Sequence, residues 1–332
     1  MEKIAIIGLG LIGGSIALAL KRAGLKDIQI AGNARTRDTL QRAKRLRAID
    51  QDCPTAAEAA KGARLIILAC PILATKSILE EIAPVLEEGA VVTDAGSTKA
   101  NVMRWAKDIL PDHAFFVGGH PMAGKETSGI DAADADLFRG KTWVVVPSVD
   151  APEPAVQTVL GVVQACGAQP VFMDADEHDS YVAAISHLPL TLASALFSVA
   201  FGSAAWPELA GLASSGFRDT TRLASGSAEM AHDIVMTNRE NLLHWIDRFQ
   251  DELSRFREMI ASGDSAKVLE AFGKPQIERD NYVIGGPPRR DTAGPEIETI
   301  GLGDLLLGSK ISGYLKKQQE MIREMESREK KR

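Results

Sequence analysis

The stretch Gly8-Leu9-Gly10-Leu11-Ile12-Gly13 decides the fold of the first part of the chain. It follows the apolar run Ile4–Ile7 and opens the Ala- and Leu-rich segment Leu11–Ala23, whose apolar residues have helical spacing. In such a strand–turn–helix unit the first glycine makes a tight turn, the second lets the backbone approach a pyrophosphate, and the third lets the helix pack against the strand. A plain glycine turn is the simpler alternative. The context favours a dinucleotide site formed by Gly8, Gly10, Leu11, Ile12 and Gly13.

Short apolar runs alternate with helical patterns through residues 1–175. The predicted strands are Ile4–Ile7, Ile28–Ala31, Leu65–Ala69, Ala90–Thr93, Phe115–Val117, Trp143–Val146 and Pro170–Met173. Segments between them, such as Thr75–Leu86 and Ala155–Cys166, have apolar residues at helical spacing. Almost wholly apolar strands are expected where helices cover both faces of a parallel sheet. The pattern therefore predicts an N-terminal Rossmann-type domain, a doubly wound α/β sheet that binds NAD(P).

The pattern changes near residues 174–177, after which no strand-like run occurs up to about Phe272. Long segments such as Tyr181–Phe201 and Asn241–Ile260 have a period of 3.6 residues instead. We expect residues 176–283 to form an all-helical C-terminal domain for substrate binding and dimerisation. Residues 284–332 begin with a Gly- and Pro-rich linker and continue as a charged helix or as a solvated tail.

Composition excludes several classes of protein. The net charge of −6 argues against a nucleic-acid binder. Three scattered cysteines are too few for a disulfide framework or a zinc site, so we expect no metal. The N-terminus lacks the pattern of a signal peptide, and no run of 18 or more apolar residues predicts a membrane span. These features predict a cytoplasmic globular protein.

The end of the second predicted strand bears on the choice between NAD and NADP. An acidic residue there would bind the ribose 2′-hydroxyl of NAD. The chain has Gly32-Asn33-Ala34-Arg35-Thr36-Arg37 instead, which contains no carboxylate. We expect NADP, with Asn33, Arg35 and Arg37 around its 2′-phosphate, and keep NAD as a second cofactor. Alternatively, the two arginines only cap a solvated helix.

Small and reactive residues gather in TDAGSTK (Thr93–Lys99), GGHPMAGKE (Gly118–Glu126), SHLP (Ser186–Pro189) and GFRDTTR (Gly216–Arg222). The first two follow apolar runs, where ligands of open α/β sheets bind. With GLGLIGGS at Gly8–Ser15, these motifs make the sequence similar to the prephenate and arogenate dehydrogenases of tyrosine biosynthesis, over roughly residues 1–283. The resemblance implies an NAD(P)-dependent oxidative decarboxylation, of prephenate to 4-hydroxyphenylpyruvate or of arogenate to tyrosine. It also implies a homodimer formed through the helical domain.

The resemblance further implies roles for single residues. His120 would hydrogen-bond the substrate hydroxyl and assist its loss of a proton, and Ser97 would share that hydroxyl. Arg222 would clamp a substrate carboxylate, with Arg218 as a second anion-binding candidate. His187 would line the pocket or the side-chain carboxylate site.

Glu126 would orient the pocket or meet a substrate amine. Structural alternatives stay open: a turn-stabilising role for His120, helix capping by Ser97, a core position for His187, and an Arg218–Asp219 ion pair. Two cues on substrate preference disagree. Leu190 replaces a second histidine of many prephenate-preferring relatives, which fits an arogenate-type enzyme better, whereas Glu126 is typical of prephenate-type members. The rival functions are another two-domain dehydrogenase, of the β-hydroxyacid or 6-phosphogluconate type, and a non-catalytic NADP-binding regulator.

Overall fold

The computed structural model describes residues 2–24 and 28–285. These residues divide into two compact units, the first ending at Arg239 and the second beginning at Glu240. The first unit contains a sheet with its covering helices and a run of further helices. The second consists of two long helices.

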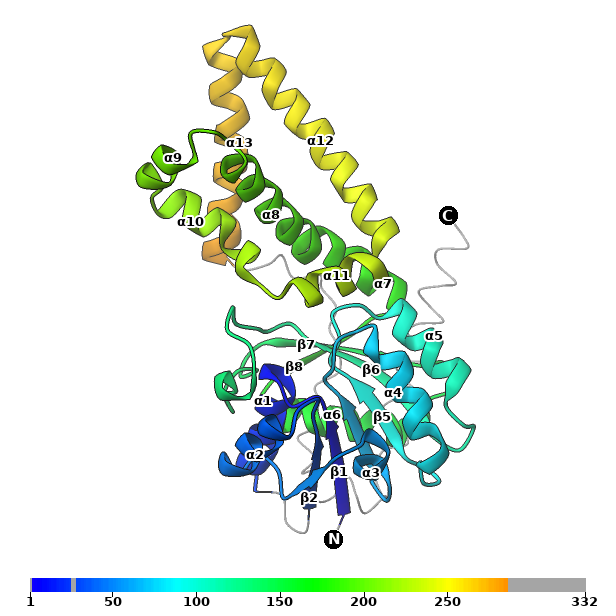
Figure 1. The fold of residues 1–332 in the computed structure, drawn as a ribbon. Helices are drawn as coiled ribbons and strands as arrows, with labels where there is room; N and C mark the ends of the chain where they lie inside the picture. Colours follow the sequence, from blue (N-terminus) through cyan, green and yellow to red (C-terminus); the bar gives the residue numbers. More distant parts are fainter. Residues whose placement is uncertain (1, 25–27, 286–332) are drawn as a thin grey trace, which may run out of the picture. The chain divides into compact units, whose positions relative to one another are not determined.

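One eight-stranded sheet organises the first part of the described chain, in the order β3-β2-β1-β4-β5-β6-β7-β8 (Figure 1). Neighbouring strands are parallel except for β6 and β7, which are antiparallel. The strands are β1 (Glu2–Ile7), β2 (Ile28–Asn33), β3 (Gln51–Cys53), β4 (Leu65–Leu68), β5 (Val91–Asp94), β6 (Phe115–Pro121), β7 (Thr142–Pro147) and β8 (Gln169–Phe172).

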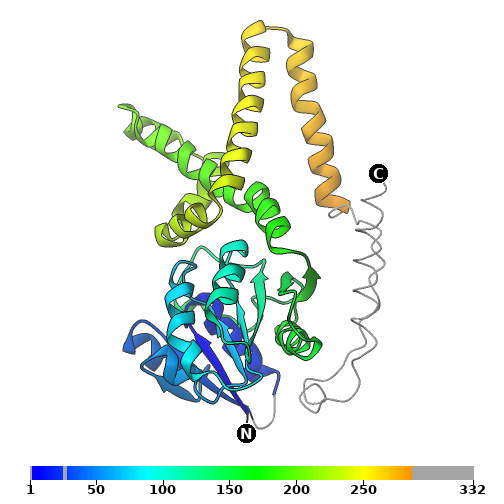
Figure 2. The same cartoon turned by 90° about the vertical axis from the view of Figure 1, so that its right-hand side faces the viewer.

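Helices cover both faces of this sheet (Figures 1 and 2). One face packs on α1 (Leu11–Arg22), α2 (Arg37–Arg45) and α6 (Glu153–Ala165). The other packs on α3 (Ala56–Ala60), α4 (Ala74–Ile82) and α5 (Ala100–Ile109). Short 3₁₀ turns lie at η1 (Ala83–Val85) and η2 (Ile130–Ala132).

The central strand β1 shows why the sequence folds in this way. Ile4 and Ile6 belong to the first core, whereas Ala5 and Ile7 belong to the second. Successive side chains of a strand point to opposite faces, so an uninterrupted apolar run needs a cover on both sides. The expected α/β domain with helices on both faces of its sheet is confirmed.

The helical part of the first unit begins with one long, interrupted helix. It runs through α7 (Ala175–Val182), the π-helical turn η3 (Ala183–His187) and α8 (Leu188–Phe201). Together these 27 residues are long and apolar enough to cross a membrane by length and composition, and 28% of their most apolar stretch is buried. The helices that follow are α9 (Trp206–Leu212), α10 (Ser215–Thr221), η4 (Arg222–Ser225) and α11 (Ala228–Thr237).

The second unit consists of α12 (Arg239–Ser262) and α13 (Ser265–Gly285). The rings of Phe256 and Phe272 pack edge to face across the pair, with centroids 5.4 Å apart. No strand occurs after β8 in the part of the chain that the structure describes, which confirms the expected all-helical second part. Most of the predicted tail at 284–332 lies outside the described residues.

Two features of the sheet differ from the sequence-based prediction. Strand β3 was not predicted, because Gln51-Asp52-Cys53 has one buried side chain and no apolar run. Strand β7 runs antiparallel to β6, whereas a parallel sheet was expected. Residues 122–141, between β6 and β7, contain only the short turn η2 and no α-helix that could form the crossover of a parallel pair.

Candidate active site

The glycine turn after β1 has the geometry of a pyrophosphate cradle. Gly8 has a φ of +97°, and a Cβ there would lie 2.4 Å from the backbone oxygen of Ala69. A Cβ at Gly13 would lie 2.0 Å from the oxygen of Gly8, so the helix can pack there only without a side chain. In contrast, a Cβ at Gly10 would meet nothing within 4 Å. Gly10 therefore leaves the backbone open to a ligand.

The first turn of α1 is free to receive an anion. Its N-cap residue Gly10 provides no side-chain cap, and the turn contains no acidic residue. Unpaired backbone N–H groups at a helix N-terminus bind phosphate well. A dinucleotide pyrophosphate thus fits the turn formed by Gly8, Gly10 and Gly13, with Leu11 and Ile12 opening the helix.

The end of β2 presents arginines rather than a carboxylate. Asn33 donates its side-chain amide to the carbonyl of Cys53, 3.0 Å away, which ties β2 to β3. The Arg35 side chain is 85% exposed and lies 3.7 Å from Glu229. The N-cap of α2 is Thr36, whose hydroxyl accepts from the backbone N–H of Thr39, so the arginines do not cap this end of the helix by themselves.

His120 lies buried near the carboxyl end of β6. Its Nδ1 is 2.8 Å from Nε2 of His178, on α7. Nδ1 of His178 is in turn 2.8 Å from a carboxylate oxygen of Asp179. Burial lowers the pKa of His120 well below 6.5, and the positive charge of the neighbouring Lys99 acts in the same direction. The imidazole of His120 is therefore uncharged at neutral pH.

His187 is the third buried imidazole of the site and closes the π-helical turn η3. Asn238 donates its side-chain amide to the backbone carbonyl of Asp179 over 2.7 Å, and the same nitrogen lies 3.1 Å from Nδ1 of His187. Since an amide nitrogen only donates, Nδ1 accepts and Nε2 carries the ring proton. That buried Nε2 has no hydrogen-bond partner among the described residues. Burial lowers the pKa of His187 to about 4, so it presents a neutral N–H donor.

A buried ion pair supports the loop between β5 and α5. Lys99 and Asp94 form this pair, with side chains 0% and 2% exposed. Asp94 also accepts from the backbone N–H groups of Gly96, at 2.9 Å, and Gly119, at 3.0 Å. The pair thereby fixes the backbone on which Ser97 and His120 stand.

Ser97 does not cap α5, although the sequence allowed that role. The N-cap residue is Lys99, and the carboxylate of Asp179 accepts from the backbone N–H groups of Lys99 and Ala100. Ser97 is half-buried, and its hydroxyl makes no hydrogen bond to the rest of the described chain. That hydroxyl is free to contact a ligand.

The predicted carboxylate clamp is already paired. Arg222, at the start of η4, forms an ion pair with Glu126, and both side chains are about half exposed. Arg218 on α10 is exposed and makes no ion pair with Asp219 or with any other described residue. The structure thus brings Arg222 and Glu126 together and leaves Arg218 unpaired.

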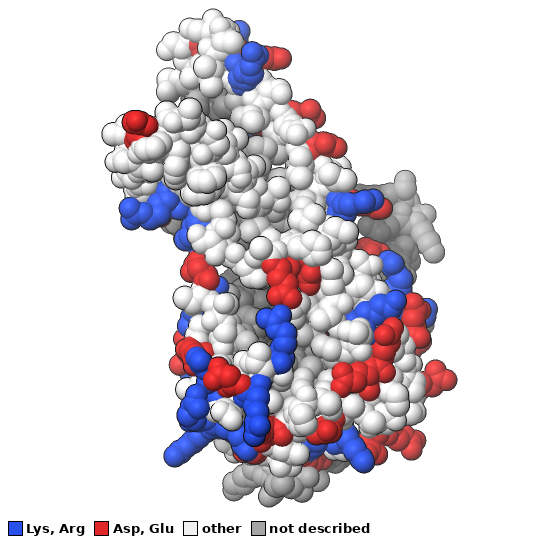
Figure 3. Space-filling view, viewed as in Figure 1, with Lys and Arg blue, Asp and Glu red and all other residues white. Residues whose placement is uncertain are grey.

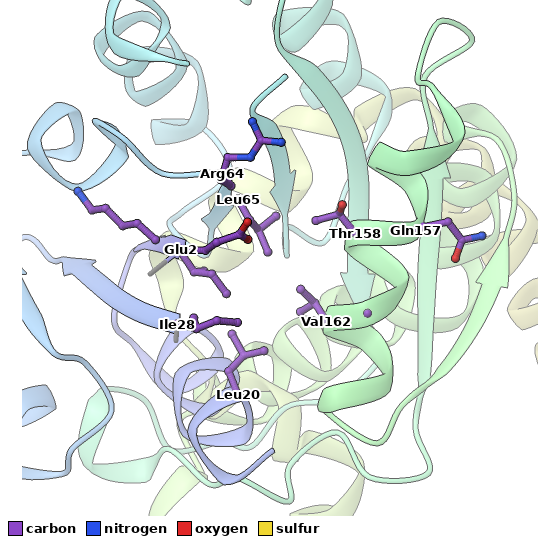
Figure 4. A pocket seen from close by; sticks show the side chains of 11 residues that line it. Glu2, Leu20, Ile28, Arg64, Leu65, Gln157, Thr158 and Val162 are labelled. Atoms are coloured by element: carbon purple, nitrogen blue, oxygen red, sulfur yellow. The ribbon is translucent and has the colours of Figure 1, made fainter. Parts of the chain in front are cut away.

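At the opposite edge of the sheet, the described residues line a small cavity. A cavity of about 40 Å³ lies there, beside the first residues of β1 and β4 (Figure 4). Leu20, Ile28 and Val162 are among the residues that line it. A cavity of this volume has room for water but is far too small for a nucleotide. The candidate site is therefore at the carboxyl edge.

Comparisons with known proteins fit this arrangement. The model of the prephenate dehydrogenase nucleotide-binding domain matches residues 16–172, and that of the prephenate dehydrogenase dimerization domain matches residues 174–274. Prephenate dehydrogenase of Bacillus subtilis is 34% identical over 285 residues, which cover 85% of this chain and 76% of that protein. The chain belongs to the prephenate dehydrogenase family.

Two solved structures extend the family likeness to the fold. Prephenate dehydrogenase from A. aeolicus, in complex with hydroxyphenyl propionate and NAD+, has a TM-score of 0.79 and 29% identity, covering 85% of this chain and 98% of that chain. Synechocystis arogenate dehydrogenase has a TM-score of 0.71 and 29% identity, covering 84% and 99%. The resemblance to the prephenate dehydrogenase family, first inferred from the motifs, is confirmed.

Sequence reasoning missed two residues of this prephenate dehydrogenase family site. His178 and Asp179 fall in the stretch Asp174-Ala175-Asp176-Glu177-His178-Asp179, which is typical of an ordinary acidic helix start. Their burial and their contacts with His120 and the start of α5 depend on the docking of α7 against β6, which no local pattern reports. The one available signal was the adjacent histidine and aspartate at the expected domain boundary.

Proposed function

We propose that this chain oxidises and decarboxylates prephenate or arogenate in tyrosine biosynthesis, with hydride transfer to a nicotinamide cofactor. The observation that carries the proposal is the buried, uncharged imidazole of His120, at the same edge of the sheet as the glycine turn. The similar A. aeolicus enzyme holds hydroxyphenyl propionate and NAD+ together. A hydroxyphenyl group is the ring that this reaction leaves behind.

The chemistry requires the protein to manage one proton. A bound nicotinamide would accept the hydrogen of the hydroxyl-bearing ring carbon together with its bonding electron pair. His120 accepts the hydroxyl proton as the carbon–oxygen bond gains double-bond character. The bond to the ring carboxylate then breaks, carbon dioxide leaves, and its electron pair makes the ring aromatic. The phenolate oxygen takes the proton back from His120, which ends the cycle uncharged.

The other proposed roles fit the charges of the site. Ser97 has a free hydroxyl for the substrate hydroxyl. The buried N–H of His187 lacks a partner, so an acceptor oxygen of the substrate would satisfy it. Arg222 would bind a substrate carboxylate in two parallel hydrogen bonds. In the structure Glu126 neutralises this guanidinium, and Arg218 supplies a second, unpaired cation nearby in sequence.

For the cofactor we propose a preference for NADP. Support comes from the lack of a carboxylate at the end of β2 and from the exposed guanidinium of Arg35. Arg37, at the first position of α2, and Asn33, at the last position of β2, would complete the phosphate contacts. The NAD+ in the A. aeolicus structure belongs to a relative with 29% identity, and we keep NAD as a second cofactor of this chain.

We also propose a homodimer formed through the helical domain. Residues 174–274 match a dimerization domain, and the surface over α8, α9 and α10 carries few charges (Figure 3). Large apolar side chains are exposed there, including Val199, Phe201 and Leu212. Apolar patches of this kind mark surfaces that another protein covers.

A steady-state comparison of four substrate pairings tests the proposed function. Prephenate or arogenate is combined with NAD or NADP, and reduced cofactor and carbon dioxide are both measured. We expect turnover of at least one cyclohexadienol, equal yields of the two products, and a higher kcat/KM with NADP. A protein that binds cofactor but turns over neither substrate would contradict the proposal, and a preference for NAD would overturn only the cofactor assignment.

A further inference from the structure

Three buried side chains form a hydrogen-bonded row that ends at His120. Asp179 Oδ1 is 2.8 Å from His178 Nδ1, and His178 Nε2 is 2.8 Å from His120 Nδ1. The two rings meet edge to face, with centroids 5.0 Å apart. His178 is 0% exposed, Asp179 1% and His120 8%. Water therefore does not compete for these hydrogen bonds.

Backbone N–H groups donate to both carboxylate oxygens of Asp179. The backbone N–H of Lys99 donates to one carboxylate oxygen over 2.7 Å, and that of Ala100 donates to the other over 2.9 Å. Both belong to the N-terminus of α5, where the helix dipole also favours a negative charge. An ionised carboxylate can only accept. The proton shared with His178 is therefore on Nδ1 of the histidine.

The proton on Nδ1 of His178 determines the protonation of the remaining ring nitrogens. A neutral imidazole has one N–H, so Nε2 of His178 accepts, and Nδ1 of His120 must donate to it. Nε2 of His120 then carries no proton. Besides His178, two groups from other elements face His120. They are Lys99, which is paired with Asp94, and His187. Neither of them donates to the ring of His120.

We propose that His178 and Asp179 are positioning residues that fix His120 in the tautomer whose Nε2 accepts the substrate's hydroxyl proton. The inference rests on the proposed function, in which His120 accepts that proton. The row does more than orient the ring, because it also stabilises the positive charge that His120 acquires during turnover. A buried aspartate assists the catalytic histidine of serine hydrolases in the same way. In this chain a second imidazole, that of His178, lies between the aspartate and the catalytic histidine. An imidazolium at His178 is the competing state, and it would place the proton of His120 on Nε2.

The ring nitrogens of His120 provide the direct readout. Nitrogen NMR of the full-length protein with ¹⁵N-labelled histidine, assigned with the His120→Asn variant, reports which nitrogen carries the proton at neutral pH. We expect the proton on Nδ1 and a bare Nε2. A proton on Nε2, or a charged ring at His178, overturns the inference. This measurement does not depend on whether variants of His178 fold.

A pair of substitutions then separates proton placement from packing. His178→Leu fills a similar volume but cannot accept from His120, and we expect kcat to fall about 10²-fold with KM within about threefold. His178→Gln can donate to Asp179 and accept from His120, and should recover at least about tenfold of that loss. His113→Leu, on the surface, is the matched control. A His178→Leu variant with normal kcat, or a glutamine variant no better than leucine, overturns the role.

The outcome is distinguishable from failure of the proposed function. If His120→Asn itself turns over normally, the proposed function fails. If His120→Asn is inactive while His178→Leu is fully active, only the positioning role of His178 and Asp179 fails.

Discussion

At the scale of single residues, the site depends on imidazoles that burial keeps uncharged. The folded-state pKa of His187 is about 4, compared with 6.5 for an ordinary histidine. As the pH falls from 6.5 towards 4, the unfolded chain binds this proton before the folded chain does. The free energy of unfolding therefore falls over that window and is fully retained above it.

This linkage gives a prediction for His187→Gln, which removes the titrating group. Urea unfolding of the variant and of the natural protein, measured at several pH values between 6.5 and 4, should show a shallower loss of stability in the variant. The unfolding curves of the natural protein give the pH at which its free energy of unfolding begins to fall. Equal slopes for the two proteins would show that His187 takes up its proton as readily in the folded state as in the unfolded state.

Single residues also show how far the sequence could predict the site. His120 and Ser97 stand in motifs at strand ends, so their place at the carboxyl edge follows from the order of the strands. The pairing of Arg222 with Glu126 joins residues far apart in sequence, and no periodic pattern encodes it. The same is true of His178 and Asp179, whose partners lie on β6 and α5.

At the scale of elements, Gly10 and Gly13 have different structural roles in the glycine turn. A Cβ at Gly13 would lie 2.0 Å from the oxygen of Gly8, whereas a Cβ at Gly10 would meet nothing within 4 Å. We predict that Gly13→Ala destabilises the fold by about 1–3 kcal/mol through overpacking. Gly10→Ala should leave the melting temperature unchanged and weaken cofactor binding about tenfold, or about 1.4 kcal/mol.

Thermal unfolding and cofactor titration of both variants check this contrast, and each variant is the control of the other. The result that would count against the cradle is a Gly10→Ala variant that binds NADP and NAD as well as the natural protein does.

Elements whose apolar residues recur with a clear period were predictable from the sequence. Elements that form only because of contacts with neighbouring elements were not. The apolar run of β1 indicates two covered faces, and its residues pack on both cores. Strand β3 has no such run and exists because β2 offers a parallel edge for Gln51–Cys53. The π-helical turn η3 interrupts a segment whose helical period continues on both sides, so its sequence predicts a regular helix.

At the scale of the whole molecule, the exposed apolar side chains of α8 require a cover. Val199 is 77% exposed, and Phe201 is 60% exposed. We predict that the full chain is a dimer in solution and that Val199→Lys weakens the dimer. Val149→Lys, at a fully exposed valine of the nucleotide-binding domain, is the matched control and should remain dimeric.

Light scattering during size-exclusion chromatography, over a range of protein concentrations, gives the mass of each species. A monomeric natural protein would contradict the proposed dimer. An unaltered Val199→Lys dimer would instead move the interface away from α8.

The central claim is that the imidazole of His120 accepts the proton of the substrate hydroxyl, and the His120→Asn variant tests it most directly. Steady-state turnover and cofactor affinity are measured beside His113→Asn, a control on the surface of the same domain. We expect a kcat lowered about 10²–10⁴-fold in His120→Asn, with cofactor affinity within about twofold of the natural protein and a fully active control. A His120→Asn enzyme with undiminished kcat would contradict it.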